Sequence, residues 1–220
     1  MFNCVVLATD PDAGPNRATP VVTGLARRGD VPVEVVSVVP QHGGLAVIER
    51  RRPGSATVPN ARFSTIAGDD VATAIVEHLE SRDGSLLVMA ISATGLVSRS
   101  RGSLGAHVLD GLHQPMLVLG PAVPDAAGLN SSTLVMCTNR THDSGVALPV
   151  IESWQRTFGG ARSWVAEVIP SSGWPTDTID DAVEREHVEA VATVLTDHGV
   201  DAATMVLHGA QRRRRHSRDR

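Results

Sequence analysis

The chain has 220 residues, of which 42% are hydrophobic and 20% charged, and its formal net charge is −4. These values fit one large or two small globular domains and exclude a wholly disordered chain. All 20 basic residues are Arg, so functions that need a Lys, such as a P-loop, a kinase or Schiff-base catalysis, are excluded.

The sequence gives no sign of a membrane or secreted protein. No apolar run approaches the roughly 18 residues of a membrane-spanning helix. The first residues, MFNCVVLATD, lack the basic region of a secretory signal, and two Cys make no disulfide framework. We therefore expect a cytoplasmic protein without a membrane partner.

Charge is unevenly distributed along the chain. The last nine residues, RRRRHSRDR, hold six Arg and one Asp, so residues 1–211 carry 14 Arg against 23 acids. Such a basic run could attract nucleic acid. Because the body is acidic and no groove-reading helix adjoins the run, we expect residues 210–220 to be a disordered tail and do not expect nucleic acid as a partner.

In residues 1–120, short apolar runs alternate with stretches whose apolar residues recur at helical spacing. Helices are expected around residues 21–26, from Gly68-Asp69-Asp70 to Leu79, and from Ser103 to Leu112. Strands are expected over residues 4–9, 33–39, 62–67, 86–90 and 116–119. Apolar strands separated by helices predict an α/β domain, a doubly wound, Rossmann-like parallel sheet of five strands.

Residues 121–132, PAVPDAAGLNSS, have the composition of a linker. Residues 133–209 then repeat the start of the chain, because CTNRTHDSGVALPVI aligns with ATDPDAGPNRATPVV at a distance of 129 positions. A helix is expected over about 179–197 and a strand over 203–207. We therefore predict a second domain that is a partial repeat of the first.

Four segments of the first domain resemble the universal stress protein family: VVLATD, VEVVSVVP, TIAGDDVATAIVEHL and RGSLGAHVLDGLHQPMLVLGP. The last is the most specific, because it has the Gly-Ser, helix, Pro and apolar strand that close a family domain. Together the segments cover most of residues 1–120, whereas residues 133–209 resemble only the first half of such a domain. The resemblance implies the tandem form of the family, with a second domain that is incomplete, and a stress-response role through nucleotide or partner binding without catalysis.

A nucleotide site is expected where the strands over 4–9 and 86–90 end, because doubly wound sheets bind ligands at such a point. Asp10 could accept a hydrogen bond from a ribose hydroxyl or an adenine amino group. Gly102 lets a backbone approach phosphate, and Ser103 adds a hydroxyl at a helix start, where free N–H groups favour anions. The candidate residues are Ala8, Thr9, Asp10, Val38, Ala90, Ala93, Gly102, Ser103 and Leu104.

The glycine pattern of this site departs from the family. Nucleotide-binding members have G-x-x-G, nine residues and then G-[ST], and Gly102-Ser103 matches the end of that pattern. Ala90 and Ala93 stand in place of the first two glycines, with eight residues before Gly102. Each methyl group would lie where the backbone should touch phosphate. The cofactor is therefore either ATP or AMP, with Mg²⁺, or no nucleotide at all.

Two further functions stay open. The protein could be a dimerisation scaffold with a degenerate site that binds no nucleotide, and we expect homodimerisation through the edge strand Met116–Leu119. It could also be a nucleotide-hydrolysing relative, which rests on fold analogy alone. No catalytic residue and no metal cluster is expected from the spacing of the nine His.

Overall fold

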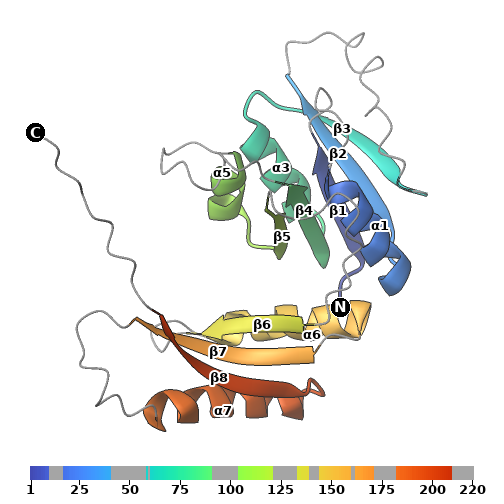
Figure 1. The fold of residues 1–220 in the computed structure, drawn as a ribbon. Helices are drawn as coiled ribbons and strands as arrows, with labels where there is room; N and C mark the ends of the chain where they lie inside the picture. Colours follow the sequence, from blue (N-terminus) through green and yellow to red (C-terminus); the bar gives the residue numbers. More distant parts are fainter. Residues whose placement is uncertain are drawn as a thin grey trace, which may run out of the picture. The chain divides into compact units, whose positions relative to one another are not determined.

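The first unit of the protein, seen in a computed structural model, is an α/β sandwich around one parallel sheet (Figure 1). The structure describes residues 1–9, 17–40, 58, 60–90, 104–120, 133–138, 144–159, 162–170 and 182–209. The elements of this unit are β1 Cys4–Thr9, α1 Ala18–Gly29, β2 Val33–Val39, β3 Arg62–Ala67, α3 Val71–Glu80, β4 Ser85–Ala90, α5 Leu104–Gly111 and β5 Met116–Leu119. The strand order is β3-β2-β1-β4-β5. The predicted doubly wound, Rossmann-like five-stranded sheet is thus confirmed.

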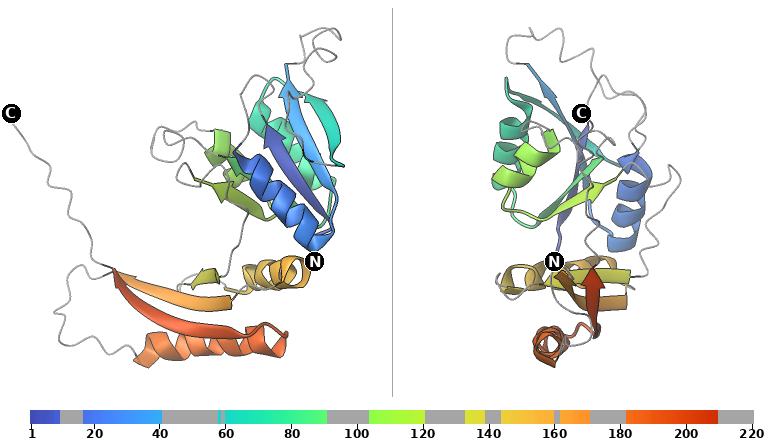
Figure 2. Two further views of the ribbon diagram at one scale, coloured as in Figure 1. Left: turned by 45° about the vertical axis from the view of Figure 1, so that its right-hand side comes forward. Right: turned by 60° about the vertical axis from the view of Figure 1, so that its left-hand side comes forward.

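Helices cover both faces of this sheet (Figure 2). On one face, α1 buries Val21, Val22 and Leu25. On the other face, α3 and α5 contribute Leu79 and Val108 to the main hydrophobic cluster. Because both faces are covered, the central strands β1 and β4 are continuous apolar runs rather than alternating ones.

The start of α3 is fixed by two residues of the expected Gly-Asp-Asp segment. The Asp70 carboxylate accepts a hydrogen bond from the Thr73 N–H at 2.7 Å and so caps the helix. A Cβ at Gly68 would lie 2.7 Å from the Cβ of Ala74, so only glycine fits there. Asp70 is therefore the N-cap of α3, which begins at Val71, after the expected Gly68-Asp69-Asp70 start.

A buried carboxylate lies near the amino-terminal end of the first sheet. Glu34 of β2 is only 2% exposed, and it forms an ion pair with Arg82 and accepts a hydrogen bond from the Ser64 hydroxyl. The His78 Nε2 lies 3.4 Å from the same carboxylate. Burial, and then the nearby Arg82 cation, hold the pKa of His78 below its usual range. This network replaces the water that a charged side chain loses in a core strand.

The second unit is a three-stranded parallel sheet with the order β6-β7-β8. Its elements are β6 Thr133–Thr138, η1 Ser144–Val146, α6 Leu148–Phe158, β7 Arg162–Pro170, α7 Ala182–Asp197 and β8 Ala202–Gly209. Its core lies between one face of the sheet and α7, where Val188 and Leu195 pack with Met136 and Val165. The apolar residues of α7 recur at helical spacing and so lie on one side of the helix. That side packs on this face of the sheet.

The opposite face of the second sheet carries exposed apolar side chains. Val168 of β7 and Leu207 of β8 are register partners, and they are 51% and 46% exposed. Val135 of β6 lies on the same face, because its register partner is Trp164 and side chains alternate along a strand. In the first unit, by contrast, α3 and α5 pack on one face of the sheet, so that apolar side chains of the strands and of the two helices are buried together.

The linker 121–132 and the tail 210–220 lie outside the described residues, so the predicted domain boundaries stay a prediction. The chain divides into one compact unit of Met1–Asn130 with Arg156–Gly159 and a second of Ser131–Gln155 with Gly160–Arg220.

Among the helices that the structure describes, none is both long and apolar enough to cross a membrane.

Candidate functional site

The carboxyl ends of β1 and β4 lie side by side in the middle of the first sheet. Leu7 of β1 is the register partner of Val88 of β4, and both strands end two residues later, at Thr9 and Ala90. On the other side of β1, Thr9 is the partner of Ser37 in β2. Three neighbouring strands therefore end at one edge, which we call the carboxyl edge of the sheet.

Helix α5 begins at this same edge. After the helix, the chain returns to the amino-terminal end of β4, because the Leu87 N–H donates to the Pro115 carbonyl at 3.1 Å and Met116 is the partner of Leu87. The helix thus runs opposite to the strands, and its first residue, Leu104, faces the carboxyl edge with 42% of its surface exposed. Its first N–H groups lack partners within the helix and form the positive end of its dipole.

The structure brings together five of the nine candidate residues at the carboxyl edge. Thr9 is the last residue of β1, Ala90 is the last residue of β4, and Leu104 is the first residue of α5. Ala8 and Val38 each lie one residue before the end of their strand, β1 and β2, and both pack against the core between the sheet and α3. Both residues are partly buried by this packing. Four candidates lie outside the described residues: Asp10, Ala93, Gly102 and Ser103.

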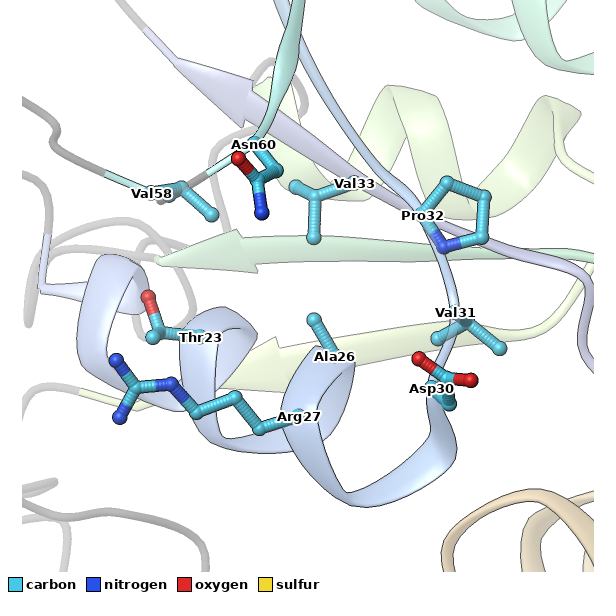
Figure 3. A pocket seen from close by; sticks show the side chains of 9 residues that line it. All are labelled: Thr23, Ala26, Arg27, Asp30, Val31, Pro32, Val33, Val58 and Asn60. Carbon is cyan, nitrogen blue, oxygen red and sulfur yellow. The ribbon is translucent and has the colours of Figure 1, made fainter.

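A pocket at the opposite edge of the sheet was not expected from the sequence (Figure 3). It has a volume of about 380 Å³ and lies beside the last turns of α1 and the starts of β2 and β3. Its lining residues are Thr23, Ala26, Arg27, Asp30, Val31, Pro32, Val33, Val58 and Asn60. In the sequence, Asp30 and Asn60 stand in turn-forming stretches, and that signal predicts a turn but no pocket.

A smaller pocket of about 300 Å³ lies between α3 and α5. Asp70, which lines it, is already engaged as the cap of α3, and hydrogen bonds from Thr73 hold its pKa below the ordinary value. Nowhere in the described ranges do three His, Cys, Asp or Glu side chains gather as metal ligands would. This pocket therefore belongs to the packing of the two helices.

Comparisons with known proteins address the fold. No family model and no curated protein matches the chain. A universal stress protein from Archaeoglobus fulgidus DSM 4304 is similar over 95% of this chain and 79% of its own, with 14% identity and a TM-score of 0.66. A putative universal stress protein from Pseudomonas aeruginosa UCBPP-PA14 is similar over 92% of this chain and 74% of its own, with 14% identity and a TM-score of 0.57.

A universal stress protein in complex with cAMP is similar over 55% of this chain and 98% of its own, with 20% identity and a TM-score of 0.44, a score too low for any inference about a ligand. The first unit, with its parallel sheet and a helix start at the carboxyl edge, defines a doubly wound α/β protein. More particularly, its fold is the universal stress protein fold, which confirms the sequence resemblance at the level of the fold.

Proposed function

We propose that the protein is a universal stress protein that binds an adenine nucleotide at the carboxyl edge of the first sheet. The observation that carries this proposal is the convergence of the ends of β1 and β4 with the start of α5. In open α/β sheets, ligands bind outside the carboxyl ends of the strands where the strand order reverses. Here β1 leads to β2 on one side and neighbours β4 on the other, so this is the reversal point.

The residues next to the described elements supply suitable chemistry. Asp10 directly follows Thr9, so it falls at the carboxyl edge, where a carboxylate can accept from a ribose hydroxyl or an adenine amino group. Gly102-Ser103 directly precede Leu104, the first residue of α5. A phosphate there would meet the positive end of the helix dipole and the Ser103 hydroxyl.

The cellular role follows from binding rather than from catalysis. A partner that binds the nucleotide-bound form more tightly than the free form would respond to the nucleotide. We propose a cytoplasmic stress-response module with ATP or AMP, and Mg²⁺ where phosphates are bound, as its ligand. The tandem arrangement of a complete domain and a partial second one belongs to the same proposal.

Thermal unfolding with millimolar ATP or AMP tests nucleotide binding. A ligand that binds only the folded state raises the midpoint, and the shift grows with its concentration. Asp10→Asn should abolish most of the shift, whereas Asp12→Asn makes the same charge change two residues later and should keep it. An unchanged midpoint for the wild type at millimolar nucleotide would refute the nucleotide part of the proposal.

One observation favours a second function, a scaffold without a nucleotide. Ala90 ends β4 with an exposed side chain, and its methyl group stands where the family has glycine. In that case, the protein would act through association of its chains. Strand β5 is the last strand on its side of the sheet, so it offers an edge for homodimerisation.

A further inference from the structure

A pocket beside α1 lies at the opposite edge of the sheet from the proposed nucleotide site. Its volume of about 380 Å³ falls in the range of small-molecule sites, which is about 300–1,000 Å³. It lies wholly within the first unit. Val33 and Val58 are buried in its floor, and Ala26 of α1 adds to the same apolar surface. The floor therefore suits a short apolar body.

Charged groups of opposite sign stand at the two ends of this floor. Figure 3 shows the Arg27 guanidinium at one end of the pocket and the Asp30 carboxylate at the other. The Asn60 amide points toward the space between them. A guanidinium is a fork-shaped donor that matches a carboxylate, and a carboxylate accepts hydrogen bonds from an ammonium group.

The walls that carry these groups are held by backbone hydrogen bonds. The N–H groups of Asp30 and Val31 both donate to the Ala26 carbonyl, the second at 3.2 Å. The Val5 N–H donates to the Pro32 carbonyl at 3.0 Å, which ties the turn to β1. The backbone of this turn is therefore already ordered before a ligand binds, which lowers the entropic cost of binding.

Two turn residues that line the pocket have a left-handed backbone. Asp30 has a φ of 48° and Asn60 a φ of 62°, and in the part of the chain that the structure describes these are the only non-glycine residues with positive φ. Both line this one pocket. Asp and Asn adopt this conformation more readily than other non-glycine residues, so the two turns hold these side chains at the pocket without strain.

We propose that this pocket binds a small zwitterion, a molecule whose carboxylate and ammonium groups are separated by a short apolar chain. The carboxylate meets Arg27, the ammonium meets Asp30, and the apolar chain lies on Val33 and Val58. The proposal needs no nucleotide and does not depend on the function of the carboxyl edge.

Titration of the full chain with 6-aminohexanoate, followed by amide NMR, tests this assignment. The expected result is a set of saturable shifts at Ala26, Val31, Val33 and Asn60. Hexanoate and hexylammonium, which each carry one of the two charges, should bind about fivefold more weakly, as expected for loss of a partly exposed ion pair. Shifts confined to other residues would overturn the proposal. So would the absence of any saturable shift at 6-aminohexanoate concentrations up to about 50 mM, a range that reaches weak binding.

Variants separate the two charges. Arg27→Gln should remove the advantage of 6-aminohexanoate over hexylammonium, while Arg28→Gln, the same change on the next residue, should preserve it. Asp30→Asn should remove the advantage over hexanoate, and Asn tolerates the left-handed backbone at this position, so the fold is kept. Equal affinities of all three probes for the wild type would show that the pocket does not recognise a zwitterion.

Discussion

Leu7 of β1 and Val88 of β4 are register partners at the centre of the first sheet, and each is followed by only two more strand residues. That relationship sets Thr9 and Ala90 at the same level of the sheet. It also means that the loops after the two strands, which hold Asp10 and Gly102-Ser103, leave from neighbouring points. The proposed nucleotide site depends on this pairing.

The first prediction concerns the methyl group of Ala90. Ala90→Gly should raise affinity for an adenine nucleotide severalfold, because the backbone at the end of β4 could then approach the phosphates. The same change should lower the stability of the free protein by about 0.5–1 kcal/mol, since glycine loses more freedom on folding. Calorimetric titration and urea unfolding measure the two opposite effects, and an affinity that does not rise would show that the methyl group is not the obstacle.

The second prediction concerns the ion pair of Glu34 and Arg82. Arg82→Ala should lower the free energy of unfolding by about 2–3 kcal/mol, because it leaves the buried carboxylate without its partner. Arg62→Ala, which removes an Arg at the start of neighbouring β3, should cost much less. Urea unfolding checks both, and equal losses would mean that the Glu34 pair is no more important than a surface charge.

The third prediction is a pH dependence carried by His78. The pKa of His78 is held below its ordinary value of 6.5 by burial and by Arg82, with Glu34 opposing, so the unfolded chain takes up a proton first as pH falls. The stability from this residue is thus complete above pH 6.5 and declines as pH falls below that value. In urea midpoints measured from pH 7.5 to 5, His78→Gln should flatten this decline and the exposed control His113→Gln should not.

The fourth prediction concerns the free edge of β5. Pro115 turns its carbonyl toward β4, and backbone groups alternate along a strand, so the N–H of Val118 points outward. Val118→Pro should therefore block homodimerisation through this edge without breaking the pairing of β4 with β5. Leu117→Pro should instead destabilise the fold, because that N–H points toward β4. Light scattering of the wild type and Val118→Pro decides, and a monomeric wild type would rule the dimer out.

The boundaries of the first sheet could be read from the sequence because four of its five strands end directly before a charged, proline or glycine residue. Strands β1, β2, β3 and β5 have the predicted ends, and β4 begins one residue earlier than expected, at Ser85. Ser85 is a polar residue that is fully buried, which no pattern of hydrophobicity indicates. In the second unit, α7 is described from Ala182, so residues 179–181 of the predicted helix lie outside the described residues, and β8 extends to Gly209.

The polar network and the pocket could not be predicted, because both depend on contacts between distant parts of the chain. Glu34 is one acid within an apolar strand, and its partner Arg82 lies 48 residues away. The pocket likewise combines α1 with Asn60, which precedes β3. The predicted ends of β1 and β4 are confirmed, and the structure places Thr9, Ala90 and Leu104 at one edge, but the nucleotide site itself stays a prediction because Asp10, Gly102 and Ser103 lie outside the described residues.

The location of nucleotide binding is the most direct test of the proposed function. Amide NMR of the full chain during titration with AMP should show saturable shifts at Thr9, Ala90 and Leu104, while Val31 and Asn60 at the opposite edge stay unchanged. No shifts at millimolar AMP, or shifts only at the opposite edge, would contradict the account.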